Sequence, residues 1–203
     1  LDADVVLSPG TLAALVSALS TPAPRMAAPS AEYVLDDASW PVRAFHRVFT
    51  QLPYAESSLG GVGVYAVSAA GRARWDRFPD VHGDDLYVQR QFSAGERLRV
   101  PGSARVKAPK TVGSLVAVRT RIARGNQTLA RVGAETGHAN LGSSTRQTMA
   151  ALGRSVLRRP SLAPAAAVYV GITLAARLRA RTSKDQTWLR DDTTRDGPAG
   201  PQN

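Results

Sequence analysis

Apolar residues recur at helical spacing in three separate stretches of the chain. Residues 12–19 follow a turn, and they predict an amphipathic helix of about 11 residues. Residues 40–52 carry a second apolar helical face, and residues 112–124 carry a third. Gly125 predicts the end of this third helix, because glycine is common just past helix C-termini.

Strand signals lie between these helical stretches. Arg97–Val100 and Ala104–Lys107 alternate basic and apolar residues, and Pro101-Gly102 between them predicts a turn that joins two paired strands. Tyr33–Leu35 predicts a further short strand. Residues 21–29 are rich in proline and alanine and are predicted to form a loop. The chain is therefore expected to combine strands and helices.

A glycine-rich stretch leads into another predicted strand. Gly60, Gly61 and Gly63 precede an alternation of β-branched and aromatic residues that ends at Ser68. Glycines allow a ligand or another backbone to come close, so this stretch is a candidate floor for a sugar or an acceptor. The alternative is a tight turn into a buried strand. The stretch lacks the Lys-Ser/Thr of a phosphate-binding loop.

Two adjacent carboxylates, Asp84 and Asp85, stand at the start of a short helical pattern that includes Leu86 and Phe92. Aspartate is stabilised at a helix N-terminus by the helix dipole and is a good capping residue. Capping alone explains one acidic residue. A carboxylate placed there is also a candidate general base.

A second acidic pair, Asp2 and Asp4, comes just before the apolar run Val5–Leu7. Carboxylates at positions i and i+2 of an extended segment point the same way. Mg²⁺ takes oxygen ligands and usually only one or two from protein carboxylates. The pair is therefore a candidate site for a divalent cation, although the pattern is short and turns are rich in aspartate.

Arginine dominates the charge of this chain. The formal net charge is +10, and lysine occurs only at 107, 110 and 184. A basic balance favours an anionic partner, while a genomic preference for arginine and alanine codons is an alternative explanation. Aromatic residues are only 6% of the chain and no nucleic-acid-binding motif is recognisable, so no nucleic-acid partner is expected.

The lack of cysteine and the spacing of the histidines exclude several kinds of catalytic and metal site. The chain contains no cysteine, which excludes disulfides, thiolate metal sites and a cysteine nucleophile. The three histidines stand at 46, 82 and 138 without metal-binding spacing, so a histidine-bound zinc site is not expected.

Residues 161–176 carry no charge, and arginines resume at position 177. As a helix this run extends about 24 Å, which is short of the ~30 Å hydrocarbon core of a bilayer. It is predicted to be membrane-associated, either spanning a thin bilayer or lying at its surface. A buried helix packed on the rest of the protein is the alternative. Residues 182–203 form a polar tail.

In this order, the pieces resemble the second half of a family 2 glycosyltransferase of the GT-A fold, over about residues 1–132. Asp2-Ala3-Asp4 resembles the DxD motif of that family, and Asp84-Asp85 stands where the family has Glu-Asp. Arg119 and Arg121 resemble the two arginines of its Gln-x-x-Arg-Trp-like helix. Three residues depart from the family pattern: Asp84 replaces Glu, Val118 stands at the Gln position and Ile122 replaces Trp.

The resemblance implies a fold and a set of roles. The fold is α/β: a partial GT-A domain with a mixed sheet flanked by helices and a C-terminal hydrophobic helix. Asp2 and Asp4 bind Mg²⁺ or Mn²⁺ and, with Arg119, Arg121 and Arg124, a nucleotide-diphospho-sugar donor. Gly60, Gly61 and Gly63 contact the acceptor, and Asp85 or Asp84 is the general base. The missing Gln and Trp favour a non-processive transferase over a polysaccharide synthase.

The resemblance also implies a place in the cell and a domain plan. The expected reaction is inverting transfer to a glycan or lipid-linked acceptor in bacterial cell-surface synthesis, on the cytoplasmic face of the cell membrane. Residues 133–159 are expected to form a loop and linker helix, and residues 160–181 the membrane-associated helix. Leu1 is expected to lie within a longer enzyme, so that this chain alone is inactive. The rival interpretations are a non-catalytic, basic scaffold at an anionic membrane surface and, less favoured, a nucleic-acid-binding protein.

Overall fold

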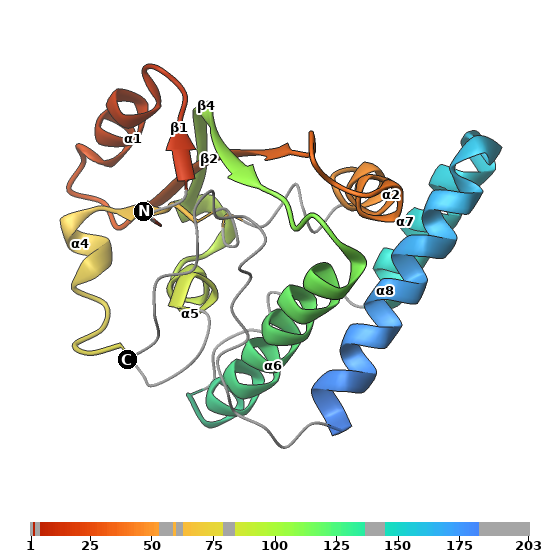
Figure 1. The fold of residues 1–203 in the computed structure, drawn as a ribbon. Helices are drawn as coiled ribbons and strands as arrows, with labels where there is room; N and C mark the ends of the chain where they lie inside the picture. The colour runs from red at the N-terminus through yellow and green to blue at the C-terminus, as the bar shows by residue number, and fades with distance from the viewer. Residues whose placement is uncertain are drawn as a thin grey trace, which may run out of the picture.

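The computed structural model (Figure 1) combines a four-stranded mixed sheet with helices on both of its faces and a separate helical layer. It describes residues 2, 5–52, 59, 63–78, 84–136 and 145–182, except the side chains of 131–136. The elements are β1 (Val5–Leu7), α1 (Thr11–Leu19), β2 (Met26–Val34), α2 (Trp40–Phe49), β3 (Ala66–Val67), α4 (Ala69–Arg72), α5 (Asp84–Arg90), η1 (Ala94–Glu96), β4 (Arg97–Lys107), α6 (Val112–Thr136), α7 (Thr145–Arg158), η2 (Pro160–Leu162) and α8 (Ala163–Thr182).

The strands follow the order β1-β4-β2-β3. The central pair, β2 and β4, is parallel, and the two outer strands run antiparallel to their neighbours. The α/β class and a mixed sheet flanked by helices are thus confirmed.

The second strand overturns the loop that was predicted for residues 21–29. β2 begins at Met26, and its small residues alternate between the two faces of the sheet. Ala27 packs with Leu15 of α1 on one face, while Met26 and Ala28 pack with Val88 and other residues of the opposite core. Alanine and proline are poor strand formers in isolation, and burial on both faces overrides that preference.

The predicted pair of strands around Pro101-Gly102 is also wrong, because β4 is one continuous strand. Its register against β2 shifts between Ala28 and Ser30, where β4 contributes extra residues. Gly102 has a φ of 96°, and a Cβ there would lie 2.1 Å from Thr11 Oγ1. The Pro-Gly pair therefore forms a bulge against α1 rather than a turn.

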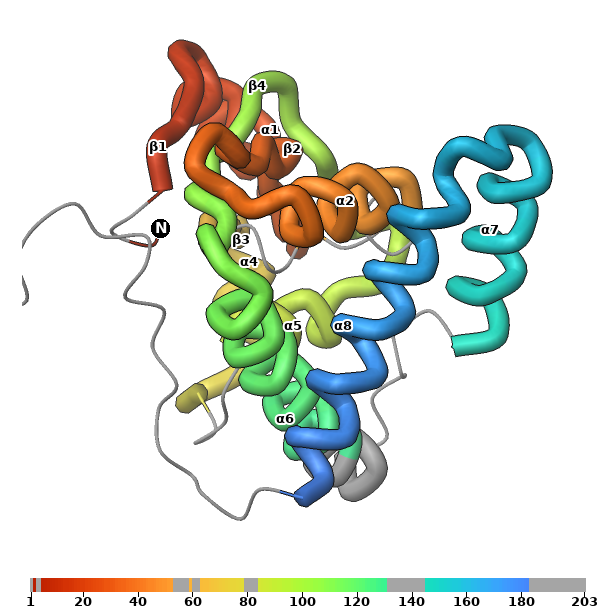
Figure 2. Tube along the Cα trace, turned by 45° about the vertical axis from the view of Figure 1, so that its right-hand side comes forward, coloured from red at the N-terminus to blue at the C-terminus, as the bar shows by residue number. Residues whose placement is uncertain are grey.

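A third cluster of buried residues lies between α2, α6, α7 and α8. Phe45 of α2 stacks on Tyr169 of α8, with ring centroids 5.1 Å apart. Figures 1 and 2 show α8 running alongside α6, with α7 on its outer side. α6 continues to Thr136 instead of ending at Gly125, which is buried inside the helix.

Candidate functional site

The acidic pair Asp84-Asp85 opens α5, as the sequence predicted. The inner face of α5 is fixed by burial of Val88 and of Gln89, whose side-chain oxygen accepts a hydrogen bond from the Leu59 backbone at 3.0 Å. The Arg90 guanidinium donates to the Leu129 carbonyl of α6 at 2.6 Å. α5 is therefore held against both the core and α6, and its first turn has a fixed position.

Asp84 is held by a tyrosine. The Tyr65 hydroxyl donates a hydrogen bond to Asp84 Oδ2 at 3.1 Å. Asp85 Oδ1 accepts from the backbone N–H of Leu86 at 2.7 Å. Asp84 is exposed and Asp85 is half-buried, so the two carboxylates are in different surroundings although they are adjacent in sequence.

Asp2 lies beside Gly63, two residues before Tyr65. Its backbone N–H donates to the Gly63 carbonyl at 2.7 Å. A Cβ on Gly63 would lie 3.0 Å from Asp2 Oδ2 and 2.6 Å from Val5 Cγ2. Gly63 also has a φ of 71°, which favours glycine. The absence of a side chain at Gly63 thus leaves room for the Asp2 carboxylate.

Tyr65 interacts with both acidic motifs, through its hydrogen bond to Asp84 and through the charges of Asp85 and Asp2. Burial raises the pKa of Tyr65 most, and Asp84, Asp85 and Asp2 raise it further because their negative charges oppose ionisation of the phenol. Three carboxylates from two distant parts of the chain therefore act on one hydroxyl group. Two of the predicted acidic motifs, represented by Asp2 and by Asp84-Asp85, converge on Tyr65.

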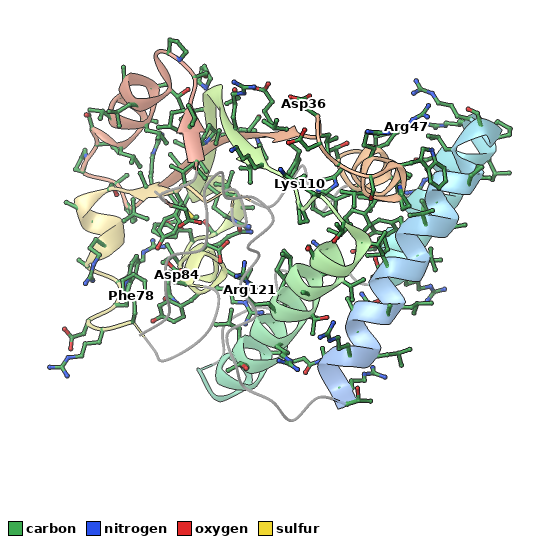
Figure 3. The ribbon with its side chains drawn as sticks, viewed as in Figure 1. Asp36, Arg47, Phe78, Asp84, Lys110 and Arg121 are labelled. Carbon is green, nitrogen blue, oxygen red and sulfur yellow. The ribbon has the colours of Figure 1, made fainter. Side chains whose placement is uncertain are left out.

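The structure separates the predicted arginines. The Arg119 guanidinium lies over two rings of α2, 5.6 Å from the Phe45 centroid and 5.2 Å from the Phe49 centroid. Residues two apart on a helix point in nearly opposite directions, whereas residues three apart share a face. Arg121 and Arg124 therefore share a different face of α6, and Figure 3 shows the Arg121 side chain on the side toward α5.

Carboxylate oxygens are the donors that a hard divalent cation such as Mg²⁺ prefers. The residues that the structure describes contain no group of three His, Cys, Asp or Glu side chains suited to a metal ion. Mg²⁺ bound to a diphosphate needs only one or two protein carboxylates, and the Asp2 oxygen beside Gly63 can supply one. Asp4, Gly60 and Gly61 lie outside the described residues.

Tyr65 is the residue that sequence reasoning missed. It stands within the predicted glycine-rich strand, but β3 is only Ala66–Val67 and Tyr65 precedes it. Antiparallel pairing of β3 with Met26 and Ala27 fixes the direction of this segment. A tyrosine in a strand is ordinary, and only the tertiary contact with Asp84 distinguishes it.

No protein-family model, curated protein or solved structure matches the chain.

Proposed function

We propose that this protein takes part in the metal-dependent, inverting transfer of a sugar from a nucleotide-diphospho-sugar to an acceptor hydroxyl. The observation that carries the proposal is the convergence of Asp2, Asp84 and Asp85 around Tyr65. The GT-A fold is part of this proposal, and the parallel β2–β4 pair with antiparallel neighbours is compatible with it.

In this reaction Asp85 removes the proton of the acceptor hydroxyl as the acceptor oxygen bonds to the anomeric carbon. The bond from that carbon to the diphosphate breaks on the opposite face of the sugar. Asp84, held by Tyr65 at 3.1 Å, is a positioning residue that leaves the other carboxylate for the base. Asp84 is exposed and Asp85 is half-buried, so an acceptor can reach the pair from solvent.

The leaving diphosphate requires positive charge near it. Asp2 would hold Mg²⁺ or Mn²⁺, which neutralises diphosphate charge when bound. Arg121 and Arg124 share the face of α6 that supplies further positive charge. Arg119 is left out of the proposed site because its guanidinium lies over Phe45 and Phe49.

Binding and transfer test different parts of this proposal. We expect UDP or GDP to bind in the presence of Mn²⁺, and Asp2→Asn to weaken that binding at least tenfold. In a form of the protein that transfers sugar, Asp85→Asn should retain binding and reduce transfer by about two orders of magnitude or more, the usual contribution of a general base. Asp36→Asn, an exposed acid beyond β2 (Figure 3), is the control. Unchanged Mn²⁺-dependent binding in Asp2→Asn would contradict the proposed role of Asp2.

We further propose that the protein acts on a glycan or lipid-linked acceptor at the cytoplasmic face of the cell membrane. Within the described residues, Pro160–Thr182 is long and apolar enough to cross a membrane. Arg158 and Arg159 precede it and Arg177, Arg179 and Arg181 lie in its last two turns, which favours contact with anionic lipids. These two features support membrane association.

A further inference from the structure

The outer side of α8 carries an unbroken apolar stripe. Its members recur every three or four residues, so they lie on one helix face. They are all exposed: Ala163, Ala167, Gly171, Leu174 and Leu178. Leu174 is 52% exposed and Leu178 is 60% exposed. A contiguous apolar patch rimmed by polar residues on a surface indicates an interaction site.

The stripe continues onto α7, which packs beside α8. The two helices enclose an open groove of about 550 Å³ whose lining is apolar. Met149, Gly153 and Val156 line it from α7, and Val170 lines it from α8. Leu157 near the end of α7 is 82% exposed. We call α7, η2 and α8 together, residues 145–182, the C-terminal hairpin.

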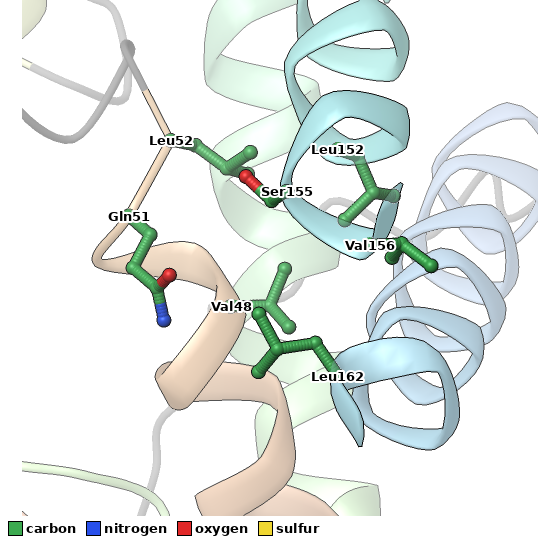
Figure 4. A pocket seen from close by; sticks show the side chains of 7 residues that line it. All are labelled: Val48, Gln51, Leu52, Leu152, Ser155, Val156 and Leu162. Carbon is green, nitrogen blue, oxygen red and sulfur yellow. The ribbon is translucent and has the colours of Figure 1, made fainter. Parts of the chain in front are cut away.

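The opposite side of the C-terminal hairpin is attached to the body of the protein. Tyr169 stacks on Phe45, and the Thr120 hydroxyl of α6 donates to the Ala176 carbonyl at 3.4 Å. At the turn, Leu162 contacts the end of α2 near Val48 in a tight crevice (Figure 4). The exposed apolar stripe is therefore what remains after α8 has packed against α2 and α6.

The charge of the C-terminal hairpin has one sign. Residues 145–182 contain no acidic residue, and their arginines are all exposed: Arg146, Arg154, Arg158, Arg159, Arg177, Arg179 and Arg181. They border the apolar stripe at the turn and at the open end. An apolar face with arginines around it is complementary to the acyl chains and phosphates of an anionic lipid surface.

We infer that the C-terminal hairpin docks in the plane of an anionic membrane surface and does not span the bilayer. A spanning α8 would have to leave α2 and α6 or carry them into the hydrocarbon, and α6 carries Arg121 and Arg124. In-plane docking keeps that packing and buries only the exposed stripe. This inference does not depend on the transferase proposal, because it rests on residues outside the acidic site.

Vesicle binding tests the docking surface. The chain should co-sediment with vesicles of phosphatidylcholine and phosphatidylglycerol, and at least tenfold more weakly with phosphatidylcholine alone. Leu174→Glu should reduce binding at least tenfold, whereas Leu12→Glu, on α1 and 66% exposed, should leave it unchanged. Arg154→Gln with Arg158→Gln should also reduce it about thirtyfold, since each basic residue near the surface adds ~1 kcal/mol. Arg77→Gln with Arg105→Gln is the matched control.

Labelling of single cysteines distinguishes docking from spanning, because the natural chain has no cysteine. Ser161→Cys lies in η2, just before α8, and Thr182→Cys lies at the last residue of α8. In a bacterial host, both should react with an impermeant maleimide in inverted membrane vesicles, and neither should react in intact spheroplasts. Reaction of one position in each preparation would show a spanning helix and overturn the inference.

Two other results would also overturn it. One is equal vesicle binding by Leu174→Glu and Leu12→Glu. The other is a vesicle-independent dimer that Leu174→Glu dissociates, with no vesicle binding by the natural chain, since the occupant of the stripe would then be a second copy.

Discussion

The fit between Gly63 and Asp2 can be tested by adding a single methyl group. Gly63 and Gly10 both have positive φ angles, 71° and 80°. A Cβ on Gly63 would lie 2.6 Å from Val5 Cγ2 and 3.0 Å from Asp2 Oδ2, whereas a Cβ on Gly10 would have no atom within 4 Å. Gly63→Ala and Gly10→Ala therefore share a backbone cost and differ in the contacts of the new methyl group.

The magnitudes follow from these two contributions. A left-handed alanine costs about 1–2 kcal/mol, and the loss of unfolded-state entropy offsets about 0.4–1 kcal/mol of that. Gly10→Ala should therefore lower the free energy of unfolding by about 1 kcal/mol. Overpacking against buried Val5 adds about 1–3 kcal/mol, so Gly63→Ala should lower it by about 2–4 kcal/mol.

Urea unfolding followed by tryptophan fluorescence measures the difference. With a slope of about 2 kcal/mol per molar urea, the midpoint of Gly63→Ala should fall about 1 M below that of Gly10→Ala. Mn²⁺-dependent binding of UDP or GDP is the second measurement, because the methyl group displaces the Asp2 carboxylate. Equal midpoints and equal nucleotide binding in the two variants would refute the placement of Asp2 against Gly63.

Three predictions concern titrating groups. Because burial and then neighbouring carboxylates raise the pKa of Tyr65, its ionisation should begin above the ordinary ~10. Asp84→Asn should shift it downward in alkaline absorbance spectra referenced to Tyr65→Phe, and no shift would contradict the contact. A hydrogen-bonded arginine lowers the pKa of Glu96 to about 2, so the pair stabilises the fold above the ordinary pKa of 4.5 and loses this effect as the pH falls toward 2. Glu96→Gln should thus lower the urea midpoint at pH 7 but not at pH 2, and an equal loss at both would be contradictory. Burial lowers the pKa of His46 and Arg119 lowers it too, so neutral His46 contributes stability above pH 6.5 that is lost as the pH falls through its lowered pKa. Arg119→Met should raise that pKa in imidazole NMR titrations, and an unchanged value would place Arg119 elsewhere.

Elements with strong local periodicity were predictable from the sequence. α2 buries its predicted apolar face, and α5 begins at Asp84. α1 forms where a helix was predicted, but Leu12 and Val16 of its predicted apolar face are exposed. Pro164 lies in the first turn of α8, where its missing N–H has no helical partner to lose, so it does not interrupt the helix. Local signals thus located these elements because local physics determines them.

Long-range pairing was not predictable in the same way. β2 is a strand because Ala27 and Ala28 are buried between β4, α1 and the α5 side of the core, and alanine carries no strand signal of its own. The bulge at Gly102 depends on Thr11, which is far away in sequence. Residues that meet only in the folded chain leave little trace in a local pattern.

In the candidate site too, the local patterns were predictable and the contacts between distant residues were not. The two acidic motifs were visible as short local patterns, but the Tyr65 contact that connects them was not. The family resemblance assigns Arg119, Arg121 and Arg124 together to the donor, although helix geometry places Arg119 and Arg121 on different faces. That separation was available from their spacing. Only the structure shows which rings lie beneath the Arg119 guanidinium: those of Phe45 and Phe49.

α6 joins the proposed acidic site to the proposed membrane surface. One side of it donates from Thr120 to Ala176 of α8, and farther along, its Leu129 carbonyl accepts from Arg90 of α5. A membrane that docks the C-terminal hairpin therefore also fixes the orientation of α5 and its acid pair through one continuous helix. An acceptor attached to a lipid would then be presented from a surface with a constant relation to Asp85.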